Sequence, residues 1–148
     1  MRKMTWVASV AMALVAVSGA CKKAAPPPPV VQEPAPPPPP LAVGMVDLGK
    51  AINANKQVAA SMTQFGIRDT IYASVATTGV ATSATISAKW TFQTGQLVDS
   101  TSQAVAPTGP ANTEFHITKK SAWPAGKYKV AIMLNGGQAM EKEFEIKK

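Results

Sequence analysis

The sequence is poor in the residue types that build most catalytic and metal centres. Its 148 residues include one Cys and one His, and charged residues make up only 16%. This scarcity excludes disulfide frameworks, most metal clusters and most nucleophile–base pairs. The chain also lacks a phosphate-binding glycine loop and a G-x-S-x-G elbow. We therefore expect no catalytic residue, no metal ligand and no cofactor, and we do not expect an enzyme.

The positive charge is spread thinly along the chain. The formal net charge is +7, and the largest basic clusters in the second half are the pairs Lys119–Lys120 and Lys147–Lys148. Nucleic-acid binding usually requires a denser basic patch with interleaved aromatic residues, or a recognisable reading module. We therefore expect no nucleic-acid partner, and we interpret the lysines as solubilising surface residues.

Proline is concentrated in one segment. Ten of the 13 prolines lie between Pro26 and Pro40. Proline fixes φ and lacks a backbone donor, so neither helix nor sheet is expected there. Residues 21–40 are predicted to be a disordered, proline-rich linker, in which polyproline II over residues 24–40 gives a semi-rigid stalk with a reach of about 50 Å. A docking ligand for an aromatic-lined groove or for the cell wall is the alternative.

Residues 1–20 have the pattern of a signal peptide. Met1-Arg2-Lys3 is basic, and Thr5–Ala20 is apolar but shorter than the ~20 apolar residues of a membrane span. The segment ends in Gly19-Ala20-Cys21, which resembles the lipobox of bacterial lipoproteins, although Ser18 replaces the usual aliphatic residue. The resemblance implies cleavage between Ala20 and Cys21 and lipid attachment to Cys21.

The anchor defines the expected location and partners. By resemblance to lipoprotein sorting, Lys22 in place of Asp favours the outer membrane, facing the periplasm or the cell surface. The expected partners are a membrane, through the N-terminal lipid, and an envelope protein or glycan. The alternative is ordinary secretory cleavage after Ala20, which would leave Cys21 as a free thiol on a secreted protein.

From Leu41 onward, apolar and polar residues alternate. The clearest pair of segments is 127–134 and 140–146, the second of which alternates apolar residues with glutamates. Alternation predicts half-buried strands, and the intervening Asn135-Gly136-Gly137 suits a tight turn with positive φ. We predict a hairpin here, with lysines of the first strand opposite the glutamates on the solvent face.

Alternation predicts further strands, and residues 57–63 could instead form a short helix. The predicted segments are 43–52, 57–63, 71–77, 84–93, 96–105 and 114–118. Seven or eight short strands separated by turn signals predict an all-β, two-sheet antiparallel sandwich over residues 41–148.

Two features resemble immunoglobulin-like domains. The stretch from Gly126 to Val130 resembles the G-x-Y-x-C segment in which a tyrosine corner, here Tyr128, pins a loop to the sandwich. Trp90 resembles the buried core tryptophan of that fold. Val130 and Val75 stand where the two cysteines would be, so packing must hold the sheets together. The resemblance spans residues 65–148 and implies an immunoglobulin-like fold without implying a function.

Few single residues qualify as functional. Alternation points Tyr72 away from the core, which makes it the candidate binding residue. His116 is expected on a strand as an ordinary surface residue, and Asp47, Asp69 and Asp99 are isolated in the sequence. Trp123 precedes a proline and is expected to plug one end of the sandwich.

The anchor, the stalk and a domain with few candidate site residues favour a non-enzymatic interaction module. One alternative is an architectural tether between membrane and cell wall. Another is a small periplasmic enzyme inhibitor that acts through the loop 106–112, where two prolines preorganise the backbone.

Overall fold

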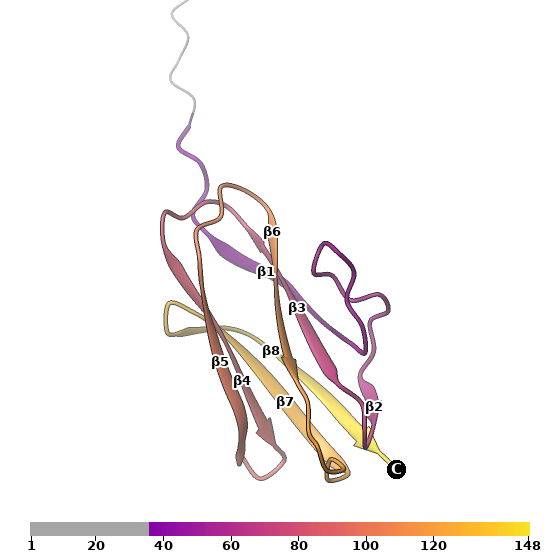
Figure 1. Cartoon of the computed structure of the whole chain (residues 1–148). Helices are drawn as coiled ribbons and strands as arrows, with labels where there is room; N and C mark the ends of the chain where they lie inside the picture. The colour runs from indigo at the N-terminus through magenta and orange to yellow at the C-terminus, as the bar shows by residue number, and fades with distance from the viewer. Residues whose placement is uncertain (1–35) are drawn as a thin grey trace, which may run out of the picture. The chain divides into compact units, whose positions relative to one another are not determined.

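A computed structural model describes residues 36–148 (Figure 1). The predicted signal peptide (1–20), the lipidation and cleavage residues Ala20 and Cys21, and residues 21–35 of the predicted stalk lie outside the described residues. Within residues 36–148, no helix is long and apolar enough to cross a membrane.

Residues 36–148 fold into eight strands. They are β1 (Ala42–Gly49), β2 (Gln64–Gly66), β3 (Ile71–Thr78), β4 (Ala84–Phe92), β5 (Leu97–Val105), β6 (Ala111–Ile117), β7 (Gly126–Leu134) and β8 (Gly137–Lys147). One sheet has the order β1-β3-β6, and the other has the order β2-β8-β7-β4-β5. The two sheets lie face to face in Figure 1 and form an immunoglobulin-like sandwich, as predicted.

The predicted hairpin is β7–β8. Asn135 and Gly136 have φ values of 51° and 85°, as the turn requires. On the solvent face, the Lys129 Nζ lies 3.0 Å from Glu141 Oε1 and 3.2 Å from Glu143 Oε1. The turn between β4 and β5 also has a positive φ, which is 80° at Gly95.

The core lies between the sheets and is built from the inward residues of both. Trp90 is fully buried, and its ring meets Phe144 edge-on at 5.9 Å between centroids. The Tyr128 ring stacks on the same Phe144, with 5.3 Å between the ring centroids. Val75 and Val130 are fully buried, and burying a valine side chain contributes about 1.5–3 kcal/mol. Apolar packing therefore holds the sheets together at the positions expected to replace cysteines.

Residues 57–63 were predicted to form a strand or a short helix, and both predictions are wrong. This segment is neither a regular strand nor a helix, but part of a loop on β1 with one isolated bridge between Ile52 and Val58. The reason is local: the Asn53 carboxamide oxygen accepts hydrogen bonds from the amides of Asn55 (2.9 Å) and Gln57 (3.1 Å). Side-chain acceptors of this kind compete with regular backbone pairing.

Three further differences concern strand boundaries and direction. The short strand β2 was not predicted, and it runs parallel to β8, so the sandwich is not wholly antiparallel. The predicted first strand, 43–52, reaches only Gly49, because pairing with β3 ends there. The predicted loop 106–112 is shorter, because Ala111 and Asn112 already pair with β3. Each difference depends on pairing between distant segments.

Candidate binding groove

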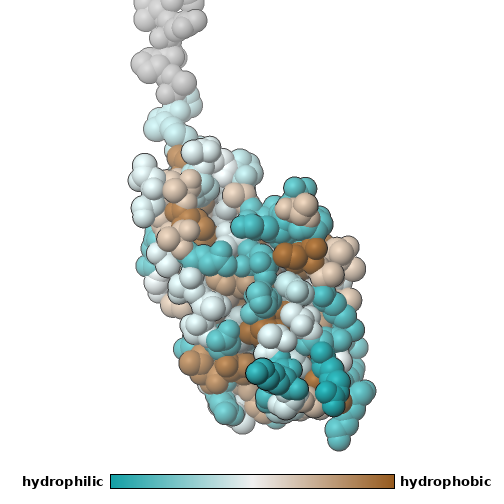
Figure 2. Space-filling model, in the orientation of Figure 1, coloured by the Kyte–Doolittle hydropathy of each residue, from teal (hydrophilic) through white to brown (hydrophobic). Residues whose placement is uncertain are grey.

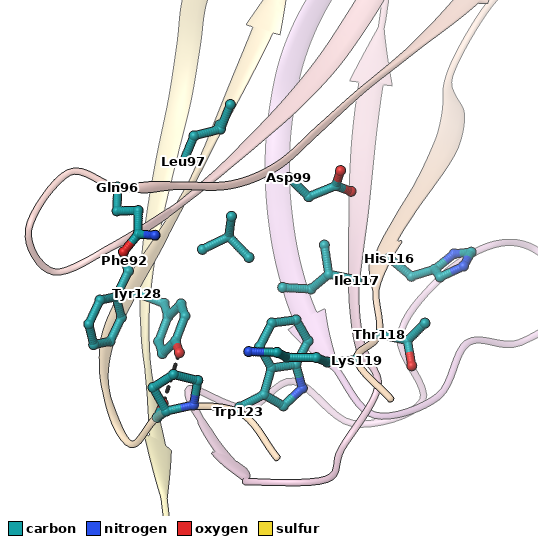
Figure 3. A pocket seen from close by; sticks show the side chains of 12 residues that line it. Phe92, Gln96, Leu97, Asp99, His116, Ile117, Thr118, Lys119, Trp123 and Tyr128 are labelled. Carbon is teal, nitrogen blue, oxygen red and sulfur yellow. Dashed lines mark hydrogen bonds between the residues drawn. The ribbon is translucent and has the colours of Figure 1, made fainter. Parts of the chain in front are cut away.

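A groove opens between the free edges of the two sheets. β5 is the edge of one sheet and β6 is the edge of the other, and the loop that follows β6 closes the groove below. The cavity has a volume of about 560 Å³ (Figure 3). Its lining residues come from three regions of the chain: Phe92, Gln96, Leu97, Val98 and Asp99; His116, Ile117, Thr118 and Lys119; and Trp123, Pro124 and Tyr128.

The lower part of the groove is held in place by two buried aromatic side chains. The Tyr128 hydroxyl donates a hydrogen bond of 2.8 Å to the Pro124 carbonyl, which is the predicted tyrosine corner (Figure 3). The Trp123 Nε1 donates to the Asp69 carbonyl oxygen at 2.9 Å. Trp123 therefore plugs this end of the sandwich, as expected. Both rings are fixed by packing and by a hydrogen bond, so the shape of the floor is preorganised.

The rim of the groove carries polar and charged side chains. Lys119 lies over the Trp123 ring, with its Nζ 5.7 Å from the ring centroid. His116 is exposed, and its Nδ1 lies 2.6 Å from Glu114 Oε1. Leu97 is 54% exposed, an unusual exposure for a large apolar side chain in this domain. A floor of apolar and aromatic side chains under a polar rim is typical of sites that bind a ligand.

One hydrogen bond closes the upper part of the gap between the two edges. The Gln103 side-chain amide on β5 donates to the Glu114 carbonyl on β6 at 2.6 Å. The N–H and C=O of one strand residue point to the same side, and this direction repeats every second residue. The backbone groups of His116 therefore face the groove, as the Glu114 carbonyl faces Gln103. An unpaired strand edge of this kind is available to a binding partner.

The structure places the sequence-predicted residues close to the groove but not all within it. Tyr72 lies on β3 opposite His116, and the two rings are 5.4 Å apart, but Tyr72 does not line the groove. Its proposed binding role remains a prediction. His116 and Trp123 do line the groove. Leu97 and Lys119 were not predicted as site residues, because a gap between two strand edges leaves no pattern along the sequence.

Asp69 is isolated in the sequence but not in the fold. Its Oδ2 lies 2.6 Å from the Lys50 Nζ and accepts the Gly66 amide at 2.6 Å. These interactions, led by the hydrogen bond from Lys50, lower the pKa of the Asp69 carboxyl. Burial raises the pKa of the Tyr128 hydroxyl above its usual value. Asp47 is not isolated either, since the Ser61 hydroxyl donates to it at 3.0 Å. Among the described residues, no three His, Cys, Asp or Glu side chains are grouped to hold a metal ion.

No protein-family model and no curated protein sequence matches this chain. Solved structures share its fold at low sequence identity. A β-glucosidase from Erythrobacter marinus is 7% identical with a TM-score of 0.51, over 72% of this chain and 15% of the glucosidase. An immunoglobulin-like protein from Pseudomonas aeruginosa is 13% identical with a TM-score of 0.46, over 72% of this chain and 96% of that protein.

A third similar structure is the alkylpurine DNA glycosylase AlkC from Pseudomonas fluorescens, bound to DNA containing an abasic site analogue. It is 13% identical with a TM-score of 0.49, over 73% of this chain and 30% of the glycosylase. The chain thus spans less than a third of the glycosylase and of the glucosidase. These likenesses concern the fold, and residues 36–148 are an immunoglobulin-like β-sandwich.

The prediction about partners requires a correction. It named a membrane reached through the N-terminal lipid, an envelope protein or glycan, and no nucleic acid. The finding that contradicts the exclusion of nucleic acid is one similar structure, the DNA glycosylase, which was solved on DNA. The physical reason is that the exclusion rested on short basic runs in the sequence, which do not show which cations the strand order brings together.

Proposed function

We propose that this chain is a lipid-anchored lipoprotein of the cell envelope, and that its immunoglobulin-like domain is a non-enzymatic interaction module. The groove between β5 and β6 carries the proposal for the domain. Its aromatic floor is fixed by hydrogen bonds, its rim is polar, and an unpaired strand edge borders it. This combination supports the binding of a partner.

The anchor in the proposal is the lipid on Cys21. The segment Gly19-Ala20-Cys21 supports cleavage after Ala20 and acylation of the new N-terminus. Residues 21–40 would then act as the stalk that separates the domain from the lipid, and Lys22 favours the outer membrane. One acyl chain binds a membrane reversibly, whereas several chains at ~0.8 kcal/mol per buried CH₂ hold it durably.

Intact-mass analysis of the mature protein, extracted from cells with detergent, tests the anchor. We expect the mass of a chain that begins at Cys21 and carries acyl groups. A Cys21→Ser variant should lose this mass and should leave the membrane fraction. A mature chain that begins at Cys21 with an unmodified thiol, released into the medium, would show that the anchor is wrong.

Site-specific photocrosslinking in cells tests the groove. The chain offers a matched pair of exposed apolar residues: Leu97, which lines the groove, and Met45 on β1, which does not. They are 54% and 57% exposed, so a photoreactive residue is equally accessible at both positions. We expect a discrete crosslinked adduct from position 97 and none from position 45. Equal yields, or none at either position, would count against the groove as the interaction site.

A further inference from the structure

The fold gathers most of the cations of the domain at one end of the sandwich. Residues 41–148 contain eleven Lys and Arg residues. Seven of them lie at the end of the sandwich where strands β1, β6 and β8 finish and strands β3 and β7 start. We call these seven residues the basic end: Lys50, Arg68, Lys119, Lys120, Lys127, Lys147 and Lys148. Hydrophilic side chains gather at the lower end of the view in Figure 2.

Hydrogen bonds and strand pairing hold these segments together. The Trp123 amide donates to the Ile67 carbonyl at 2.7 Å, which places the loop after β6 against the loop that carries Arg68. β2 pairs with the last residues of β8, so the C-terminal lysines lie beside Arg68. The N-terminal Pro36–Pro40 enters at the opposite end, where the Val80 amide donates to the Pro39 carbonyl (Figure 1).

Most of these cations have no carboxylate partner. Asp69 pairs with Lys50 at 2.6 Å, and Glu145 pairs with Lys147 at 3.3 Å. The other five cations form no ion pair within residues 36–148, and all five are exposed: Arg68, Lys119, Lys120, Lys127 and Lys148. Asp99 is the remaining carboxylate near this end, on the rim of the groove. The basic end is therefore a site of uncompensated positive charge.

The arrangement of the cations indicates the chemistry of the ligand. The five unpaired cations belong to four separate segments of the chain and do not share an acceptor. A ligand that carries several anionic groups can therefore contact more of them than a single anion can. Four of the five unpaired cations are lysines, which contact phosphates as point charges without the two-pronged geometry that reads bases. Trp123, which lies under Lys119, is buried and already donates its N–H, so its ring is not free to insert into a bilayer.

We propose that the basic end binds the phosphate backbone of nucleic acid, without base specificity. This inference goes beyond the proposed function, because it depends neither on the lipid at Cys21 nor on occupation of the groove. If about five phosphates are contacted, the logarithm of the affinity should fall with the logarithm of salt concentration with a slope of about −4 to −5. A rise from ~50 to ~150 mM salt should then weaken binding about a hundredfold.

The test uses the full-length chain in nonionic detergent and two short DNA duplexes of unrelated sequence. Binding is measured by fluorescence anisotropy at several salt concentrations. The test variant carries Arg68→Gln, Lys120→Gln and Lys148→Gln. The matched control carries Lys56→Gln, Lys89→Gln and Lys142→Gln, which remove the same charge away from the basic end. Both keep Lys22 and Lys23, and circular dichroism verifies that each variant is folded.

We expect both duplexes to bind equally, with micromolar affinity at ~50 mM salt. The test variant should bind at least tenfold more weakly, and its salt slope should fall to about −2 because three phosphate contacts are lost. The control variant should stay within about threefold of the parent chain, as distant charges are screened beyond ~10 Å.

Three outcomes would overturn the proposal. The parent chain could fail to bind DNA at low salt. Both variants could lose affinity equally, which would mean that net charge alone attracts the duplex. The parent could also fail to bind DNA and yet bind vesicles of phosphatidylcholine and phosphatidylglycerol more tightly than the test variant does, which would make the basic end a lipid-binding surface. None of these outcomes affects the crosslinking test of the groove or the mass analysis of Cys21.

Discussion

The tyrosine corner offers a sharp test of how the sandwich end is held. The substitution Tyr128→Phe removes the hydroxyl that donates to the Pro124 carbonyl at 2.8 Å, and it leaves the ring that stacks on Phe144. Tyr72→Phe is the matched control, because the Tyr72 ring is half-buried on β3 and does not line the groove. The chain has only these two tyrosines.

The expected cost follows from the burial of the group. A hydrogen bond between neutral groups contributes about 1 kcal/mol to the free energy of unfolding, and an acceptor that stays buried without a partner costs about 1–3 kcal/mol. Pro124 is exposed, so water can reach its carbonyl and the lower value applies. We therefore expect Tyr128→Phe to lower the free energy of unfolding by about 1 kcal/mol, and Tm by about 4 °C. Tyr72→Phe should change stability by less than about 0.5 kcal/mol.

Alkaline pH provides an independent measurement. Burial raises the pKa of the Tyr128 hydroxyl above its usual value of 10.0, so the folded state holds this proton more tightly than the unfolded state does. The contribution of the protonated hydroxyl is fully present below pH 10.0 and is lost as the pH rises through the folded pKa. Stability of the parent chain should fall in that window, and Tyr128→Phe should reduce the fall.

Urea unfolding monitored by tryptophan fluorescence measures both effects. In the Tyr72→Phe background, Tyr128 is the only tyrosine, and the absorbance of tyrosinate reports its pKa directly. The reasoning would be refuted if Tyr128→Phe cost no more than Tyr72→Phe, or if the single remaining tyrosine titrated at or below 10.0.

Three further substitutions, the first with a control, test particular backbone and charge positions by urea unfolding. Gly136→Ala, at φ 85° in open space, should cost about 1–2 kcal/mol through backbone strain alone, whereas Gly109→Ala, also in open space but without positive φ, should be neutral. Gly79→Ala should also displace the prolines packed on it, because its Cβ would collide with the Pro40 carbonyl; limited proteolysis near residue 40 should then become faster. Asp69→Asn should cost about 1–2 kcal/mol near neutral pH. The lowered pKa of Asp69 means that its contribution is present above 3.8 and is lost as the pH falls through the folded pKa, so parent and variant should converge in acid. A constant difference between them at low pH would contradict this assignment.

Local patterns of residues were sufficient for the strands and turns of the second half of the domain. The β7–β8 hairpin follows from alternation and from Asn135-Gly136, which adopt the positive φ that the turn needs. Trp90 was predicted as the core tryptophan and Tyr128 as a tyrosine corner because the residues around them resemble those of immunoglobulin-like domains, and both side chains are buried. These features are readable because each depends on residues that are close together in the chain.

The loop 53–62 and strand β2 could not be predicted from local sequence patterns. The first depends on the Asn53 side chain replacing backbone pairing, and the second on a parallel pairing with β8, some eighty residues away. The predicted signal peptide and lipid anchor at Cys21 are sequence motifs in the residues outside the described structure, and they remain predictions.

The sequence alone was therefore enough for the class of fold, the core and the turns, because alternation and turn chemistry act over a few residues. The groove and the basic end were decided by tertiary structure. The groove exists because β5 and β6 are the edge strands of the two sheets and lie next to each other. The basic end exists because the strand order brings Arg68, Lys120 and Lys148 to one end of the sandwich. Charge density on a surface depends on which strand ends meet in space, and the spacing of lysines along a chain does not contain that information.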